Sequence, residues 1–189
     1  VELDKVVYSW TDGVWIAVTA PNFNSDPNKI DYIGDKPDSR ITITSTNGKT
    51  LDFFKLEETG IDTGVFIGHV LLTGFSYDAD GDGKDDPVMY RSDIAGETFG
   101  KGPWGGFMKA EPGNVITVKF SEKYSGSTNT HEAKAEVEFW LAELSWQSYE
   151  NKIGEPVTIT VVDKDMDLDH YSRDRLYVDV ITDADAGKY

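Results

Sequence analysis

The stretch Tyr77–Asp86, with the sequence YDADGDGKDD, holds the residues best suited to metal chemistry. It carries five aspartates within nine positions, together with a single lysine. Carboxylates this close repel one another unless a cation neutralises them. Ca²⁺ takes about six to eight oxygen ligands in flexible geometry, and Gly83 permits a sharp bend. The predicted ligands are Asp78, Asp80, Asp82, the backbone carbonyl of Lys84, and Asp86, the last directly or through a water.

This predicted calcium loop departs from the helix-loop-helix calcium hand. That motif requires a glutamate at the twelfth loop position, where this chain has Met89. The flanking residues also favour strand or coil over helix. We therefore predict a calcium loop of the kind found in extracellular β-proteins, and the alternative is a solvated acidic turn without an ion.

Oxygen donors also alternate in two other loops, each directly after an apolar run. One set is Asp163, Asp165, Asp167 and Asp169, and the other is Asn22, Asn24 and Asp26. Both sets are candidate calcium ligands, the first between domains, although the asparagine loop has only one charged member. The alternative is Asx-turn capping, in which these side chains bond to nearby backbone amides.

The elements that must position these loops are predicted to be β-strands. Apolar and β-branched residues recur at every second position in short runs bounded by turn residues. These runs are Val14–Val18, Ile41–Ile43, Ile116–Phe120, Val157–Val161 and Leu176–Val180. Asn47-Gly48 predicts a hairpin turn. The segment 132–144, EAKAEVEFWLAEL, is rich in helix formers but alternates, so we expect one long strand there.

Composition narrows the possible partners. The chain has 34 acidic and 18 basic side chains and a net charge of −16, which disfavours nucleic acid and anionic lipid and attracts cations. It has no cysteine, which excludes disulfides and thiolate zinc sites. No apolar run approaches the ~18 residues of a membrane span, so we expect none in this segment. Any leader peptide has been removed or lies outside these residues.

The remaining motifs do not predict an enzyme or catalytic residues. Residues 100–105 match GxGxxG, but Pro103 and the turn-forming residues that follow favour a surface loop with Trp104 on the sandwich. The three histidines lie far apart, and no HExxH or GxSxG is present. Glu57 and Glu58 are expected to be strand-end residues. We expect the five tryptophans to pack in the core and between domains, the alternative being an exposed row that stacks on sugars.

The chain also repeats itself. VWIAVTAPNFNSD from Val14 aligns with VTITVVDKDMDLD from Val157, 143 residues later. We therefore expect a complete β-sandwich over 1–144, with the acidic loop inserted, and the start of a second, truncated repeat over 145–189. A remnant of two or three strands cannot bury both faces of a sheet, so we expect it to dock on the first domain or on another chain.

Several segments resemble the immunoglobulin-like repeats of archaeal surface-layer proteins, closest to those of ammonia-oxidising archaea. They are YSWTDGVWIAVTAPNFNSDP, EETGIDTGVFIGHVLLTG, KGPWGGFMKAEPGNVITVKF and VVDKDMDLDHYSRDRLYVDVITDADAG. The resemblance implies an immunoglobulin-like β-sandwich, an extracellular location at the cell surface, and neighbouring domains and like subunits as partners. It also implies that a full second repeat would continue into its own Thr-Gly-Val-Phe strand.

From these observations we expect a structural component of a calcium-stiffened, extracellular array. A first alternative is a carbohydrate-binding or other ligand-binding module of a secreted multidomain protein, which could recognise cell-surface glycans. A second alternative is a domain appended to a secreted enzyme whose catalytic unit lies elsewhere.

Overall fold

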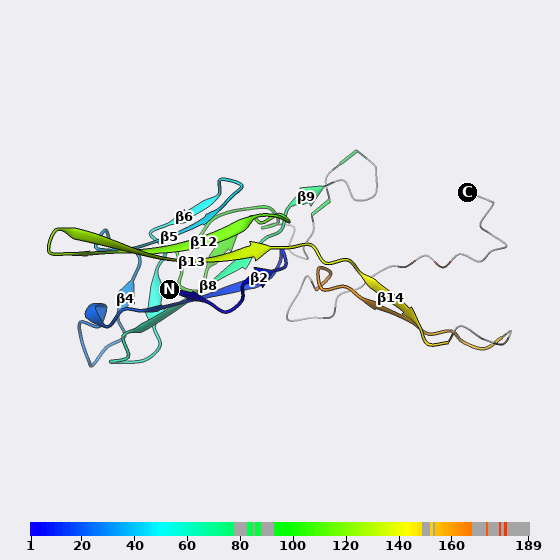
Figure 1. Cartoon of the computed structure of the whole chain (residues 1–189), viewed down its shortest axis with the longest axis horizontal. Helices are drawn as coiled ribbons and strands as arrows, with labels where there is room; N and C mark the ends of the chain where they lie inside the picture. Colours follow the sequence, from blue (N-terminus) through cyan, green and yellow to red (C-terminus); the bar gives the residue numbers. More distant parts are fainter. Residues whose placement is uncertain are drawn as a thin grey trace.

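The predicted all-β fold is confirmed by the computed structural model, in which two sheets pack face to face (Figure 1). The structure describes residues 1–77, 83, 84, 86, 87, 93–148, 152, 154–167, 173, 178 and 180. Within these residues the one helix is the short 3₁₀ turn η1 (Pro21–Phe23). No helix in the described part of the chain has the length and apolar character that a membrane crossing requires.

The first sheet orders its strands β1-β3-β8-β7-β4, and β11 also pairs with β8. Its strands are β1 (Glu2–Leu3), β3 (Gly13–Thr19), β4 (Tyr32–Ile33), β7 (Leu56–Glu58), β8 (Val65–Leu72) and β11 (Gly106–Met108). The pairings are antiparallel except that of β11 with β8, where Phe107 lies opposite Leu71. Because β3 pairs along β8 from 65 to 71, β7 and β11 share the other side of β8.

The second sheet has the order β2-β13-β12-β5-β6. Its strands are β2 (Val7–Tyr8), β5 (Ser39–Ser45), β6 (Thr50–Asp52), β12 (Val115–Tyr124) and β13 (Ser127–Val137). The predicted Asn-Gly hairpin is the β5–β6 connection, in which Gly48 has φ 84° and Thr44 lies opposite Thr50. Two further ribbons complete the described strands, β9 (Ser76–Tyr77) with β10 (Asp86–Pro87) and β14 (Glu143–Trp146) with β15 (Ile159–Val162).

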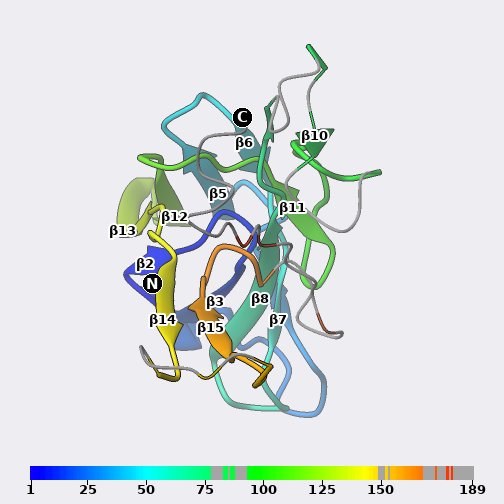
Figure 2. The same cartoon turned by 90° about the vertical axis from the view of Figure 1, so that its right-hand side faces the viewer.

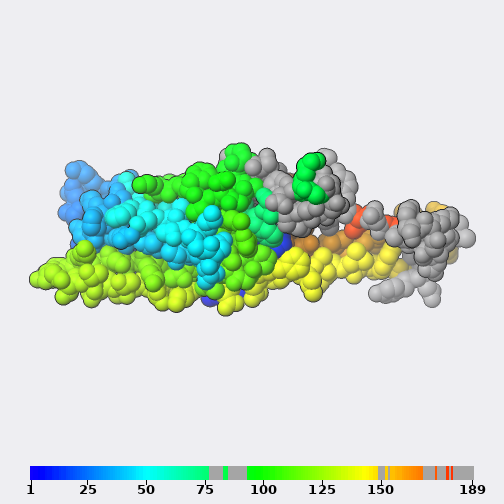
Figure 3. Space-filling view, turned by 90° about the horizontal axis from the view of Figure 1, so that it is seen from above, coloured from blue at the N-terminus to red at the C-terminus, as the bar shows by residue number. Residues whose placement is uncertain are grey.

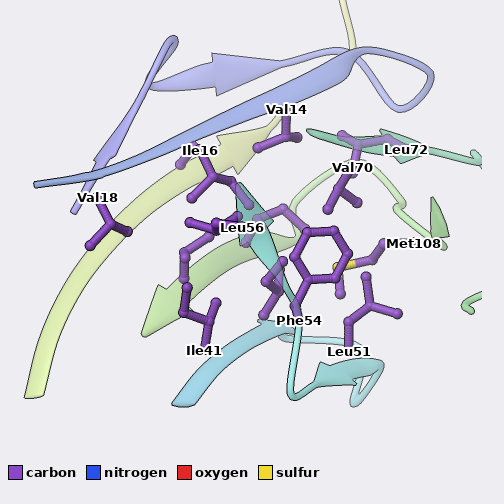
Figure 4. Close-up of a cluster of buried hydrophobic side chains, with 14 of the residues drawn as sticks. Val14, Ile16, Val18, Ile41, Leu51, Phe54, Leu56, Val70, Leu72 and Met108 are labelled. Carbon is purple, nitrogen blue, oxygen red and sulfur yellow. The ribbon is translucent and has the colours of Figure 1, made fainter. Parts of the chain in front are cut away.

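The core lies between the two sheets and follows the predicted period of two. Val14, Ile16 and Val18 point inward from β3 toward the second sheet, and Ile41 faces them from β5 (Figure 4). The Phe54 ring occupies the middle of this cluster and is fully buried. Side chains at odd positions of β3 face outward instead, so one local pattern supplies both the core and the surface of the sheet.

The glycine-rich loop 100–105 lies against this core. A Cβ on Gly106 would stand 2.6 Å from the Phe54 ring, and one on Gly102 would also collide with the carbonyl of Lys55. Glycine at these positions therefore lets the loop backbone approach the Phe54 ring closely. Strand β11 follows the loop where a dinucleotide fold would have a helix, so the loop serves packing.

The prediction of one long strand over 132–144 is wrong in one respect. β13 ends at Val137, and β14 begins only at Glu143. The Glu138 amide still donates to the Tyr8 carbonyl, at 3.0 Å, but the Phe139 ring then turns onto the Trp10 ring, with centroids 5.5 Å apart. The chain leaves the second sheet at this point, and the expected boundary after residue 144 falls inside β14.

Candidate functional site: the joint between the two repeats

The β14–β15 ribbon repeats the β1–β3 ribbon in its pairing register as well as in its sequence. Glu2 lies opposite Ala17 in the first ribbon, and Ser145 lies opposite Thr160 in the second, each position shifted by 143. The same shift relates the backbone bond from the Asp4 amide to the Trp15 carbonyl to that from Gln147 to Thr158. The predicted repeat is therefore also a repeat of backbone structure. The second ribbon projects beyond the end of the sandwich (Figures 1 and 3), and its strands β14 and β15 lie side by side in the end-on view (Figure 2).

The turns that follow the two ribbons also correspond. The Asn24 amide donates to the Pro21 carbonyl at 3.2 Å, and the Asp167 amide donates to the Lys164 carbonyl at 3.4 Å. These bonds are again 143 residues apart and fold both turns alike. We call residues 163–167 the plug, because they are the part of the second repeat that enters the first domain.

The plug is held by Asp165, which is only 2% exposed. One carboxylate oxygen, Oδ1, accepts a hydrogen bond from Ser9 Oγ at 2.9 Å, and Oδ2 accepts one from the Trp140 amide at 2.7 Å. Thr11 Oγ1 also donates to the Asp167 carbonyl, at 3.3 Å. We call Ser9, Thr11 and Trp140 the socket. Both oxygens of a buried acid are thus used to fasten one repeat to the other.

Contacts within the first domain fix the turn that carries Ser9 and Thr11. Asp12 Oδ2 accepts hydrogen bonds from the Ser9 amide at 3.1 Å and from Lys5 Nζ at 2.9 Å. The Asp12 amide also donates to the Ser9 carbonyl, which closes the turn 9–12. At the end of β8, the Leu72 amide donates to the Asp12 carbonyl. The Ser9 hydroxyl therefore stands on a turn that the first domain holds rigid.

The linker between the repeats supplies the second wall of the joint. Trp10 is buried, and its ring contacts both Phe75 and Phe139, with centroids 5.4 and 5.5 Å away. Anchoring Phe139 in this way places the next amide, that of Trp140, where it donates to Asp165. On the outside of the joint, Lys164 Nζ lies 5.6 Å from the centre of the Trp140 ring. The linker is therefore an ordered part of the contact.

Burial controls the ionisation of the joint. Removal from water raises the pKa of Asp165 above its ordinary value, and the nearby acids Asp163 and Asp12 raise it further. The hydrogen bonds from Trp140 and Ser9 act in the opposite direction but do not cancel this effect. The joint can therefore bind a proton more readily than a free aspartate would. Chemically, this arrangement holds the turn 163–167 against the first domain.

The aspartates of the first predicted calcium loop lie almost entirely outside the described residues. Asp78, Asp80 and Asp82 are among these, so their prediction is untested. The structure does show that Tyr77 lies opposite Asp86 in the β9–β10 ribbon, so residues 78–85 connect two paired strands. Gly83 has φ 84°, a conformation that favours glycine. The backbone of Lys84 and Asp86 is described, and the ligand roles predicted for both remain predictions.

The plug contains three members of the second predicted ligand set, and Asp169 lies outside the described residues. Asp163 Oδ1 accepts a hydrogen bond from the Asp165 amide at 3.0 Å, which is the Asx-turn geometry of the alternative interpretation. Asp165 is engaged by the socket. No group of three or more His, Asp or Glu side chains is placed to hold a metal within the part of the chain that the structure describes. Calcium at this loop stays a prediction.

The asparagine set is likewise occupied by turn contacts. Asn24 Nδ2 donates to Asp62 Oδ1 at 2.8 Å, and Asp26 Oδ1 accepts from the Asn28 amide at 3.0 Å. The second Asp26 oxygen pairs with Lys29. Asn22 is exposed and lines three hollows of the surface, of about 500, 460 and 220 Å³. Calcium binding by this loop also stays a prediction.

Glu58 forms a second buried fastening that sequence reasoning treated only as a strand end. It ends β7 as expected, but it is 2% exposed. Its carboxylate accepts hydrogen bonds from the amides of Gly64, Thr63 and Asp31, at 2.7, 2.8 and 3.1 Å. These bonds, that from Gly64 first, lower the pKa of Glu58. The Glu-Thr-Gly motif therefore acts as a structural clamp on the turn 59–64.

The tryptophans do not all lie where we expected. Trp10 lies in the core, as predicted, and the Trp140 ring lies 5.6 Å from Lys164 Nζ. Trp146, in β14, is 40% exposed and does not lie in the core. Trp15 and Trp104 are each 48% exposed, so the prediction is wrong for these two as well. Their rings contact each other on the outer face of the first sheet, with centroids 5.8 Å apart, and Trp104 does lie on the sandwich as predicted. Trp15 occupies an outward position of β3, where a large ring can pack on neighbours without entering the core.

The socket residues Ser9 and Thr11 were missed by sequence reasoning. Small hydroxyl residues in a turn are common, and nothing in their spacing marks them as partners of residues 156 positions away. The neighbouring Trp10, a large apolar residue shortly before the run Val14–Val18, carries the nearest usable signal. No protein-family model matches the chain, and a search of curated proteins finds no significant match.

Proposed function

We propose that this chain is a structural segment of an extracellular cell-surface array of the surface-layer type, built from immunoglobulin-like β-sandwich modules joined end to end. The observation that carries the proposal is the joint, in which a repeated ribbon and turn dock on the preceding module through the buried Asp165. A flexible linker would not need an ordered contact of this kind. Like modules held in one pose are suited to bearing load.

Calcium binding at the acidic loop 78–86 belongs to the same proposal. Five aspartates stand in this short segment, whose ends the β9–β10 ribbon brings together. A divalent cation would relieve their mutual repulsion and reduce the conformational freedom of the segment. The net charge of −16 would attract such cations to the surface of the chain. The proposed partners are neighbouring modules of the same chain and like subunits.

Two measurements test the proposal, one for the joint and one for the calcium site. Spin labels on cysteines introduced at the exposed positions Lys119 and Thr160 report the distance across the joint, and the chain has no native cysteine to interfere. We expect a narrow distance distribution that Asp165→Arg broadens. We also expect chelator to lower the melting temperature by several degrees and added Ca²⁺ to restore it, because an ion that binds only the folded state stabilises it.

The matched control for calcium is the double variant Asp80→Ala and Asp82→Ala, which should melt in calcium as the parent does in chelator. A broad distance distribution in the parent would overturn the joint. An unchanged melting temperature in chelator would overturn the calcium site. The two results are independent, so each part of the proposal can fail alone.

A second candidate function is carbohydrate binding, and the exposed ring pair Trp15 and Trp104 favours it. Aromatic faces stack on sugar rings, and a hollow of about 160 Å³ lies beside Trp15, lined also by Leu3 and Asp4. Binding on a glycan array that is lost in Trp15→Ala would support this candidate. An array without hits would argue against it.

A further inference from the structure

We infer that the turn Ala20–Asn24 of the first repeat is a second plug, which docks into the socket of another sandwich module of this kind. The inference rests on the proposed function and deepens it by naming the partner of the opposite end of the module. The turn of the second repeat is already docked, as the joint shows. Its counterpart in the first repeat has the same backbone bond and lies at the surface.

The chemistry of the first turn suits the same socket. Asn22 stands where the plug has Asp165, and its amide oxygen can accept from a backbone N–H as Asp165 does from Trp140. A serine hydroxyl can turn to accept from the amide nitrogen of Asn22, because it is both donor and acceptor. The Asn24 carbonyl then takes the place of that of Asp167, which accepts from Thr11. An uncharged plug also avoids burying a carboxylate.

Pro21, the residue before Asn22, also suits a contact with the Trp140 ring of a socket. Lys164 lies over the Trp140 ring in the joint, and Pro21 holds the corresponding position in the first turn. Proline rings pack on aromatic faces through apolar contact, with little loss of conformational entropy. Pro21 is exposed in the structure and so has a free face for such a contact.

The surface around the first turn is shaped for a partner. Two hollows beside Asn22, of about 460 and 220 Å³, are bounded by Phe23 and Tyr124 and by Phe120 and His131. Tyr124, which is 80% exposed, lies at the tip of the β12–β13 hairpin. This tip and β4 lie at the end of the sandwich opposite β14 (Figure 1). The module thus has a socket at one end and, at the other, the turn Ala20–Asn24 as a plug that is not docked.

The partner that we assign to the first turn is the socket of another such module, and not the socket of its own domain. Strand β3 has seven residues and separates the two ends by about 20 Å, so the first turn cannot reach the socket of its own domain. That socket is already filled by the tethered plug 163–167. Repeated docking of plug into socket is a heterologous contact, which extends modules into a row instead of closing a dimer.

Disulfide trapping in the full chain tests the inference. The variant Asp165→Arg opens the socket, since Arg cannot accept the bonds of Ser9 and Trp140 and is too large for the site. In this background we add Ser9→Cys and Asn22→Cys and oxidise at increasing protein concentration. Because the parent has no cysteine, every disulfide joins introduced cysteines, and mass spectrometry of the linked peptides distinguishes a link between positions 9 and 22 from links between two like positions. We expect a ladder of covalent oligomers on non-reducing gels.

The matched control pairs Ser9→Cys with Ile61→Cys in the same background. Ile61 is 57% exposed on the neighbouring turn at the same end, so it measures random collision. A ladder at least about tenfold stronger for the Asn22 pair supports docking, and restoring Asp165 should suppress it because the tethered plug competes at roughly millimolar effective concentration. Equal ladders, or none, overturn the inference.

The outcome is separable from that of the proposed function. If the spin-label distances across the joint are narrow but no ladder forms, the first turn is not a plug, and the joint stands. Circular dichroism of each variant, with a melt of the sandwich unchanged within a few degrees, shows that a missing ladder does not come from unfolding.

Discussion

Two buried carboxylates each fasten a turn in this molecule, and their pKa values are shifted in opposite directions. Glu58 receives three backbone N–H bonds within its own domain, from Asp31, Thr63 and Gly64, and these lower its pKa. Asp165 receives two bonds across the joint, from Ser9 and Trp140, and burial raises its pKa. Both side chains are 2% exposed, but the cost of burial outweighs the hydrogen bonds only at Asp165.

The balance between burial, hydrogen-bond donors and neighbouring acids explains the opposite pKa shifts. Backbone amides that converge on Glu58 stabilise its charge more than burial penalises it. At Asp165 only two donors oppose burial, and two further acids, Asp163 and Asp12, stand nearby. The clamp within a module therefore holds a charge firmly, whereas the fastening between modules is open to adjustment by protons.

The largest effect that tests this contrast is expected from Glu58→Gln. The glutamine amide must turn its NH₂ toward either Asp31 N–H or the amides of Thr63 and Gly64, so that at least one buried donor loses its acceptor. We expect the melting temperature of the sandwich to fall by roughly 10 °C. Calorimetry measures this fall.

The neighbouring variant Glu57→Gln is the matched control, because Glu57 lies on the other face of β7 and is only half-buried. We expect its melting temperature to stay within about 1–2 °C of the parent value. If both variants melt alike, the Glu58 clamp does not carry the stability that we assign to it.

Much of the sandwich could be predicted from local pattern, because burial on one face of a strand imposes a period of two. Val14, Ile16 and Val18 are buried as expected, and Thr46–Lys49 forms the expected hairpin connection. The turn contacts of Asp163 were among the alternatives considered. Local pattern could not reveal the break after Val137, because it follows from Phe139 packing on Trp10, a residue far away in sequence.

The joint lies beyond sequence reasoning for the same physical cause. Ser9 and Asp165 are 156 residues apart, and neither residue type predicts a partner so far away in the sequence. Alternating aspartates predicted metal binding, and the same residues also suit capping and docking. Trp15 shows a related limit, since a large ring can satisfy either a core or a surface position, and only its neighbours on the sheet decide.

Acidification should strengthen the joint at Asp165 and, below about pH 4.5, weaken the clamp at Glu58. The docked state raises the pKa of Asp165 above its ordinary 3.8, so docking strengthens as pH falls through the raised value and is strongest below 3.8. Folding lowers the pKa of Glu58 below its ordinary 4.5, so its stabilisation is complete above 4.5 and is lost as pH falls through the lowered value. The window between neutral pH and about 4.5 therefore favours the joint without weakening the clamp.

Amide exchange read at single residues separates these effects. After correction for intrinsic exchange, we expect protection of the Trp140 amide to rise a few-fold between roughly pH 7 and pH 4.5, while that of the Gly64 amide stays constant. Asp165→Asn should remove the rise at Trp140, because the titrating group is gone. Protection at Trp140 that falls with acidification in the parent would contradict the sign we assign to the joint.

The smallest effect should come from Lys164, the residue that covers the joint from outside. Its ammonium group lies 5.6 Å from the centre of the Trp140 ring and is exposed, so the attraction is worth about 0.5 kcal/mol. Lys164→Gln should therefore lower protection of the Trp140 amide by roughly twofold, against no change for Lys152→Gln at another exposed lysine. A loss as large as that in Asp165→Arg would mean that the outer cation, and not the buried acid, carries the joint. The contrast between Glu58 and Asp165 would then no longer describe how the two repeats are held together.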